Sequence, residues 1–268
     1  MPGYESFGWL TIAWIVFVLG FAGFVHGALG LGYPLVATPL LALVIGFKAA
    51  VALVLLPTMA VVVAAIILTG GLGAMFRRFW MLPPYMIAGS IAGTATFILI
   101  DPRPLLLLLS LAMFAFLAVD WRVQRLRARA VSRGVDSAPG WVARHPRIAT
   151  ALFGTIGGFC EGGVNVAAPP LVVLFLGLGL APAQLVQALN LCFLAGKSTQ
   201  ILVLAGSGSL TVSQWLVSLP FAVLAVVVQR YATRIRERID AATYRSWLKR
   251  FLLVMAIGLA AQFGWLVR

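Results

Sequence analysis

Long apolar runs, separated by short glycine-rich, proline-rich or basic stretches, make up almost the whole chain. A helix needs about twenty apolar residues to cross the hydrocarbon core of a bilayer. Several runs reach that length, and the shorter ones must be tilted or interrupted. The pattern therefore predicts an all-α polytopic membrane protein. The predicted helices span residues 9–25, 34–45, 49–68, 81–100, 105–121, 148–160, 170–178, 182–204, 212–228 and 251–267.

Two apolar stretches, 21–42 and 157–178, contain too much glycine and proline to continue as single helices. Glycine is a weak helix former, and proline lacks the backbone donor. Lipid cannot satisfy the backbone groups exposed at a break, so the break must be buried in protein or line a watery cavity. Paired breaks in the two halves of a chain are typical of a transporter's binding site. The alternative is close helix packing through glycine, which needs no ligand.

The two broken stretches match each other at a constant offset. This match predicts two membrane repeats, 1–128 and 140–268, joined by a basic cytoplasmic loop at 129–139. Each repeat would contain a broken helical hairpin followed by spanning helices. The positions that correspond are Gly23 and Gly158, Phe24 and Phe159, Gly27 and Gly162, and Pro34 and Pro169.

Charge is scarce and unevenly placed. Hydrophobic residues make up 62% of the chain, yet the net charge is +13, and Lys and Arg gather mainly in 122–147 and 230–250. Both clusters lie between apolar runs, which favours cytoplasmic loops under the positive-inside rule over a nucleic-acid surface. The expected surroundings are a lipid bilayer, with no nucleic-acid partner.

The basic clusters also constrain the broken stretches. If each stretch crossed the membrane once, the two clusters would lie on opposite sides and one would violate the positive-inside rule. If each stretch is a hairpin, both clusters and the Arg77–Arg78 pair lie together inside. The hairpin arrangement predicts inverted repeats whose breaks meet near the middle of the membrane.

A proline stands near the start of the short helix that follows each break. Proline suits the first helical turn, and the free amides there carry about half a positive charge through the helix dipole. Two such helix ends that converge would bind an anion without a charged side chain. The candidate residues are Gly30, Gly32, Tyr33 and Pro34 in the first stretch, and Asn165, Ala168 and Pro169 in the second.

Lys197 lies deep within an apolar run. A charge at the bilayer centre costs about 2.5–3.5 kcal/mol on insertion scales, so this lysine needs a partner or a cavity. Ser198, Gln200 and Asn190 add polar groups around it and complete the candidate site. Its partner is either a transported anion or Glu161, and both can apply at different steps of a cycle.

His26 and Glu161 occupy equivalent positions, each immediately before a motif glycine. Both side chains exchange protons, and histidine does so near neutral pH. One hypothesis is that they couple transport to protons or sense the protonation state of the substrate. The alternative is local hydrogen bonding that stabilises the breaks.

Three further features have simple interpretations. Gly89 and Gly93 form a small-residue face, which predicts either a homodimer contact or packing within one subunit. Lys48, at the edge of a short helix, is expected to anchor at the interface. The second basic region is either an amphipathic surface helix or a plain loop, and the spacing that favours the helix is Tyr231, Ile235 and Ile239.

Catalytic motifs are not found in the sequence. It has no HExxH, nucleophile elbow, P-loop or clustered Cys/His ligands, and only two His and seven acidic residues. We therefore expect no enzyme, no metal site and no cofactor. Cys160 and Cys192 both fall in apolar runs, so a disulfide is not expected.

The segment from Gly27 to Tyr33, with the Pro39-Leu40-Leu41 that follows, resembles the glycine-rich motif of the sulfite exporter TauE/SafE family. The second copy, from Gly162 to Leu171, is similar to its repeat. The chain differs from the family pattern at Tyr33-Pro34 and at Asn165 and Ala167, where the family usually has glycine. The resemblance implies export of sulfite or an organosulfonate such as sulfoacetate across the bacterial inner membrane.

These observations together predict a secondary transporter that moves a small sulfur-containing anion by alternating access, with proton coupling as a hypothesis. Amides near the two breaks, together with Lys197, would hold the anion. The alternatives are a passive anion channel and a non-transporting membrane scaffold or assembly protein. An intramembrane enzyme ranks below both.

Overall fold

The computed structural model describes residues 8–133, 140–235, 250, 253 and 256–257. Regular structure in these residues is helical throughout, and five helices are long and apolar enough to cross a membrane. The predicted class, an all-α polytopic membrane protein, is confirmed. The helices are α1 (Trp9–Leu29), α2 (Tyr33–Ile45), α3 (Phe47–Thr69), α4 (Leu72–Arg78), α5 (Leu82–Leu99), α6 (Pro102–Arg133), α7 (Trp141–Arg144), α8 (Pro146–Val164), α9 (Ala168–Gly177), α10 (Pro182–Gly206) and α11 (Val212–Ile235).

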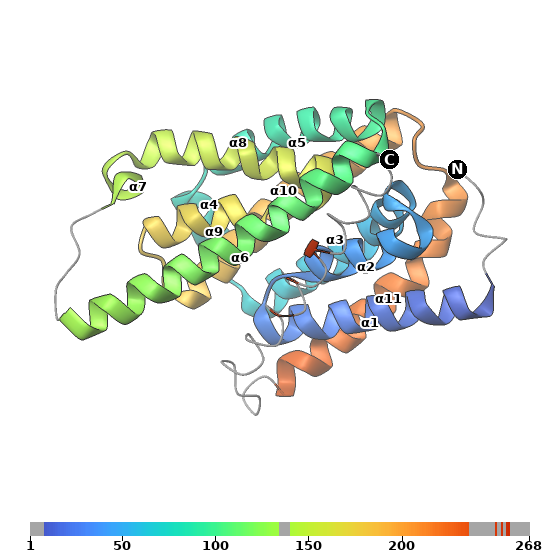
Figure 1. Ribbon diagram of the computed structural model, residues 1–268, viewed down its shortest axis with the longest axis horizontal. Coiled ribbons are helices and arrows are strands. Elements are labelled where there is room, and N and C mark those ends of the chain that lie inside the picture. The colour runs from blue at the N-terminus through green and yellow to red at the C-terminus, as the bar shows by residue number, and fades with distance from the viewer. Residues whose placement is uncertain (1–7, 134–139, 236–249, 251–252, 254–255, 258–268) are drawn as a thin grey trace.

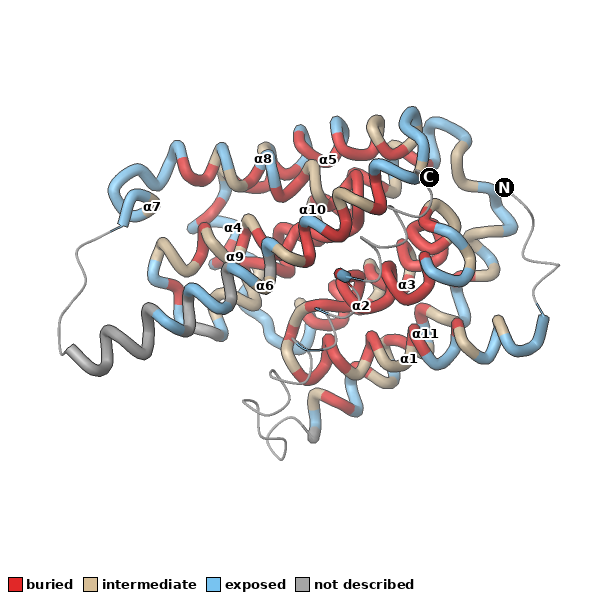
Figure 2. Tube along the Cα trace, in the orientation of Figure 1, coloured by how far each residue is buried: buried red, intermediate tan, exposed pale blue. Residues whose placement is uncertain are grey.

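The helices form two outer pairs around a buried middle. In the view of Figure 1, α5 and α8 lie along the top, α1 lies along the bottom with α11 crossing it obliquely from the right, and α2, α3, α9 and α10 lie between these pairs. Buried positions are concentrated on α2, α3 and α10 (Figure 2). The polar groups of the broken stretches are therefore enclosed by protein.

Each broken stretch is a helix, a tight turn and a second helix. The first helices, α1 and α8, continue further than the predicted 9–25 and 148–160, because each ends at a residue in the left-handed conformation. These residues are Gly30 (φ 80°) and Asn165 (φ 64°). Their amides donate to the carbonyls of His26 and Glu161 at 2.6 and 3.1 Å, which closes both helix ends in the same way.

Two predicted boundaries were wrong. Helix α6 begins at Pro102 and not at residue 105, because the missing N–H of proline is harmless in the first helical turn. The Asp101 carboxylate accepts a hydrogen bond from the Arg103 amide at 2.9 Å. The expected loop 129–139 is helical as far as Arg133, since arginine and alanine are good helix formers. Three predicted features lie outside the described residues: the remainder of that loop, Ile239 and most of the predicted helix 251–267.

Glycines allow the paired helices to approach closely. A Cβ at Gly158 or Gly162 would overlap the α5 backbone near Met86 and Ser90, and one at Gly23 would lie 2.8 Å from the Ala225 carbonyl of α11. These glycines correspond at the repeat offset, so α8 packs on α5 as α1 packs on α11. Each broken hairpin is held by a helix from the other half of the chain.

The small-residue face of α5 is used within the subunit. A Cβ at Gly89 or Gly93 would overlap backbone atoms of α8 at Thr155 and Phe159. Of the two interpretations of this face, packing within one subunit is confirmed. A homodimer remains a prediction, and its contact would have to lie elsewhere.

Helices α3 and α10, which correspond at the repeat offset, run in opposite directions. Gln187, near the start of α10, donates to the carbonyls of Thr69 and Gly70 at the end of α3, at 3.4 Å each. At the other end, Lys48 of α3 shares a cavity with Leu204 of α10.

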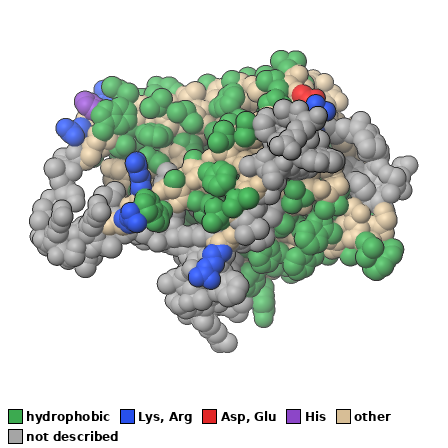
Figure 3. Space-filling view, viewed as in Figure 1, with side chains coloured by type: hydrophobic (Ala, Val, Ile, Leu, Met, Phe, Trp, Pro, Cys, Tyr) green, Lys and Arg blue, Asp and Glu red, His purple; other side chains and the backbone are tan. Residues whose placement is uncertain are grey.

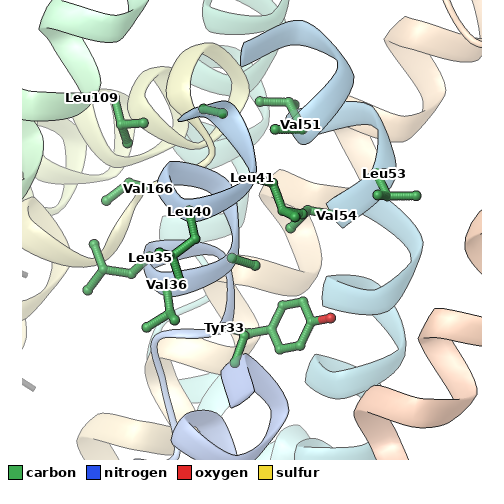
Figure 4. Packing of buried hydrophobic residues seen from close by; sticks show 14 of the residues in the cluster. Tyr33, Leu35, Val36, Leu40, Leu41, Val51, Leu53, Val54, Leu109 and Val166 are labelled. Carbon is green, nitrogen blue, oxygen red and sulfur yellow. The ribbon is translucent and has the colours of Figure 1, made fainter. Parts of the chain in front are cut away.

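The turn between the two helices of each hairpin, here called its tip, packs into the apolar core that contains the helices of the other hairpin. Val164 and Val166, at the tip of the second hairpin, belong to the core built mainly from α1, α2, α3 and α6. Figure 4 shows Val166 among Leu35, Leu40 and Leu109. Leu31, which corresponds to Val166, packs against the other core.

The outer surface is largely apolar. Large exposed side chains include Phe17, Ile67, Leu202 and Val223. On the face drawn in Figure 3, hydrophobic side chains cover much of the described surface, and the Lys and Arg side chains lie mainly toward its left and lower parts. This distribution suits a protein surrounded by lipid.

Candidate substrate site

A buried ion pair lies between α8 and α10. The Lys197 ammonium is 2.7 Å from Oε1 of Glu161, and the two side chains are 0% and 1% exposed. Removing both charges from water is costly unless further hydrogen bonds compensate. The surroundings of the pair therefore decide what the site can do.

Lys197 also donates to two side-chain amide oxygens, Oδ1 of Asn165 and Oε1 of Gln200, the latter at 2.7 Å. The amide nitrogens are occupied as well: Asn165 Nδ2 donates to Thr38 Oγ1 at 2.9 Å, and Gln200 Nε2 donates to the Gly162 carbonyl at 3.0 Å. The network thus joins α2, α8 and α10 at the tip of the second hairpin.

Helical spacing brings these groups together. Lys197 and Gln200 share one face of α10, being three residues apart, and Glu161 stands one turn before Asn165 on α8. Gly196 leaves room for the carboxylate, because a Cβ there would lie 2.9 Å from Glu161 Cγ. Ser90 Oγ of α5 donates to the Gly196 carbonyl at 2.8 Å and fixes α10 against α5.

The positions around the Lys197 ammonium are filled, but the Glu161 carboxylate is not satisfied. An ammonium has three donors, and Lys197 has three partners, namely the carboxylate in an ion pair and the two amide oxygens in hydrogen bonds. Neither carboxylate oxygen of Glu161 receives a hydrogen bond from the described residues, so the ion pair is its contact with the network. An anion could therefore reach Lys197 only by taking the place of one of its present partners.

Four of the residues singled out from the sequence meet here: Lys197, Gln200, Asn165 and Glu161. Ser198 does not join them; it is half-buried on the next position around the helix, about 100° from Lys197. Asn190 shares the face of Lys197 but lies two turns away, where its Nδ2 donates to the Val186 carbonyl at 3.0 Å.

The other predicted residues form the hairpin tips. Ala168 and Pro169 are buried in the first turn of α9, and Gly32 precedes Tyr33 and Pro34 at the start of α2. Gly30 faces Val186, about three turns before Lys197 on α10. The structure places this first tip against α10 at a different level from the Lys197 network.

His26 lies apart from the polar network. Its imidazole is 1% exposed, and neither ring nitrogen has a hydrogen-bond partner among the described residues. Glu161, at the equivalent position, is bound to Lys197. Of the two candidates for proton exchange, Glu161 is the one in contact with the buried cation.

Thr38 is the part of the network that sequence reasoning missed. Its hydroxyl, completely buried, accepts from Asn165 and connects the first hairpin to the second. The available signal was that Thr38 is the one aliphatic hydroxyl in the apolar segment 33–45.

Lys48 lies at a separate place. It donates to the Ile98 carbonyl at 3.1 Å and lines a cavity of about 220 Å³ with Phe97 and Ser209. It is half-buried at the start of α3, as expected of an anchoring lysine. Among the described residues no group of three His, Cys, Asp or Glu is placed to hold a metal ion, and both cysteines are free.

The fold and the buried cation between broken helices define a polytopic helical membrane protein with a polar centre enclosed in its middle. The sequence matches the model of one protein family, described as sulfite exporter TauE/SafE, over residues 15–263. The chain therefore belongs to this family of membrane transporters, as its motifs suggested. Comparison with curated proteins and with solved structures gave no match.

Proposed function

We propose that this protein is a secondary transporter that exports a small sulfur-containing anion, either sulfite or an organosulfonate such as sulfoacetate, across the bacterial inner membrane. The observation that carries the proposal is the fully buried Lys197, which contacts Glu161 and Asn165 at the tip of the second broken stretch. Ionisable groups within the membrane are rare and mark substrate or ion pathways. Membership of the TauE/SafE family supports the choice of anion.

The chemistry of the site suits an oxyanion. Sulfite and sulfonate oxygens accept several charge-assisted hydrogen bonds, which the Lys197 ammonium can supply. The side-chain amides of Asn165 and Gln200 lie beside it. The amides at the starts of α2 and α9 would complete the cradle in other conformations of the cycle.

Alternating access requires two halves that rock against each other about a central site. The antiparallel course of α3 and α10 and the exchange of hairpin tips between the two cores support an inverted-repeat arrangement. The expected orientation places the basic ends of α6 and α11 in the cytoplasm.

The test is uptake and counterflow of labelled sulfite and sulfoacetate in proteoliposomes. The variants are the doubly neutral Glu161→Gln with Lys197→Gln, which leaves no unpaired buried charge, and Lys48→Gln as a lysine control outside the site. We expect saturable flux and counterflow for the wild type and Lys48→Gln, and loss of both for the double variant.

Two outcomes would contradict the proposal. Flux that does not saturate and shows no counterflow would indicate a passive channel. Absence of flux in vesicles that contain folded protein, with thermal stability unaffected by either anion, would favour a scaffold.

A further inference from the structure

The Lys197 ammonium is already surrounded by protein groups, and this restricts how an anion can bind to it. Its three partners, Glu161 and the two amide oxygens, are all in place, and each neighbouring amide nitrogen already uses one of its two N–H groups, on Thr38 or Gly162. The ammonium therefore has no position free for an anion while these partners stay. Of the three partners, Glu161 is the one that carries negative charge and so most resembles an incoming anion.

We propose that Glu161 is an internal competitor of the transported anion, so that the anion binds Lys197 only when Glu161 takes up a proton. This inference rests on the proposed function and adds a coupling rule to it. One proton enters the site with each anion. The proton resides on the Glu161 carboxyl, and no covalent bond other than that O–H forms.

Charge compensation is the physical reason for the coupling. When the site is empty of substrate, the ionised Glu161 neutralises Lys197. When the sulfonate group of an anion occupies the site, a protonated Glu161 avoids a second negative charge beside the same ammonium. An ionised Glu161 next to a bound sulfonate, or a protonated Glu161 with no anion bound, would leave an uncompensated charge buried beside Lys197, which is strongly unfavourable.

The hydrogen bonding of Glu161 is compatible with the uptake of a proton. Neither carboxylate oxygen receives a hydrogen bond from the described residues, so a proton can be carried on Oε2 without breaking one. Gly196 packs closely against this side chain, since a Cβ there would lie 2.9 Å from Glu161 Cγ, and its lack of a side chain is what lets the carboxylate lie beside α10.

The surroundings of Glu161 contain few other groups that titrate. Cys160 is its neighbour on α8, and α10 contributes Cys192 and Lys197. Helix α9 carries no titratable residue, and α5 carries Tyr85, which faces Gly154 two turns away. The charged side chains whose burial is described on α6 and α7, which also touch α8, are exposed.

The experiment measures protons and anions together. Purified wild-type protein in weak buffer, with a pH-sensitive dye, is titrated with sulfoacetate at neutral and alkaline pH, where both its sulfonate and its carboxylate are ionised in solution; methanesulfonate, which has no carboxylate, is the control that assigns the proton to the protein. We expect about one proton taken up per anion bound, and an affinity that falls about tenfold for each pH unit once Glu161 is ionised in the empty site. Binding without proton uptake would overturn the inference.

Glu161→Gln supplies an independent test, because glutamine mimics the protonated carboxyl. In this variant we expect sulfoacetate affinity to be independent of pH and no proton to be taken up, while Lys48→Gln behaves as the wild type. A pH dependence in Glu161→Gln equal to that of the wild type would contradict the inference. If this variant does not fold, the wild-type proton count decides alone.

The two proposals fail in different ways. If sulfoacetate and sulfite both fail to bind the folded wild-type protein at any pH, the substrate class in the proposed function is wrong and the coupling rule falls with it. If either anion binds and is transported without protons, the function stands and the coupling rule alone is wrong.

Discussion

The tips of the two hairpins have the same backbone but different chemistry. Gly30 and Asn165 correspond, both adopt the left-handed conformation, and both close the preceding helix on the carbonyl four residues earlier. Around the second tip, Lys197 and Gln200 make a charged network. The residues at the corresponding positions of α3 are Val62 and Ala65, which cannot form one.

This difference separates the backbone geometry of the broken helices from the charged chemistry of the site. The broken backbone and the close glycine contacts occur in both halves, so they belong to the architecture. The buried charge occurs in one half, so the chemistry of the site is asymmetric. Thr38 is the point at which the first hairpin reaches the charged network of the second.

The largest expected effect comes from removing one partner of the ion pair. Lys197→Met leaves the Glu161 carboxylate buried without its cation, and we expect the free energy of unfolding to fall by about 3–5 kcal/mol. The double variant that adds Glu161→Gln should recover most of this loss. Chemical unfolding in detergent, followed by circular dichroism, measures both.

The control for this prediction is Lys48→Met, which removes a half-buried lysine bonded to one carbonyl. A loss in Lys197→Met no greater than in Lys48→Met would show that the buried pair adds little. The charge asymmetry between the two halves would then have no consequence for stability.

The glycine contacts test the shared part of the comparison. Gly27→Ala and Gly162→Ala each place a methyl group against the backbone of the partner helix, at Gln229 and Ser90. We expect each to lower the free energy of unfolding by about 1–3 kcal/mol, as overpacking does. The same unfolding assay measures both.

Gly20→Ala is the matched control, because a Cβ at Gly20 meets no atom within 4 Å. It should leave stability unchanged or raise it, since alanine is the better helix former. If Gly162→Ala is costly and Gly27→Ala is not, the two halves are not packed alike.

The apolar pattern predicted most helices because burial and helix breakers act locally. Gly32 and Gly46 have positive φ and flank α2, which therefore begins and ends within a residue of the prediction. The prediction failed where no breaker exists: α6 continues through its basic residues to Arg133. The short α4 and α7 were missed because so few residues show no periodicity.

The candidate site was predictable where residue spacing fixes geometry. Gln200 shares a helix face with Lys197, and the rule for buried charges named Glu161 as a partner. Thr38 was out of reach because its contact with Asn165 depends on how the two hairpins meet. No local pattern encodes that tertiary packing.

Asn165 combines the shared backbone with the polar chemistry, and two substitutions separate them. Asn165→Gly keeps the left-handed turn and removes the side-chain hydrogen bonds, whereas Asn165→Ala removes the same bonds and also strains the turn. We expect the alanine variant to be less stable than the glycine variant by about 1–2 kcal/mol. Thermal unfolding compares them.

Both Asn165 variants should weaken sulfoacetate binding to the same extent, because both lose the amide beside Lys197. Equal stability of the two would mean that the turn at Asn165 relaxes without cost. Its likeness to the turn at Gly30 would then be a coincidence of conformation.

His26 gives the smallest expected effect and the most direct comparison with Glu161. His26→Leu replaces a buried imidazole that has no hydrogen-bond partner among the described residues with an apolar side chain of similar size. Leaving a buried polar group unsatisfied is unfavourable, so its removal should change the free energy of unfolding by less than about 1 kcal/mol or raise it. The measurement is thermal unfolding together with proton uptake on sulfoacetate binding, which should match the wild type in both. If proton uptake disappears in His26→Leu and persists in Glu161→Gln, protons pass through the first hairpin. The asymmetry inferred from the Lys197 network would then be reversed.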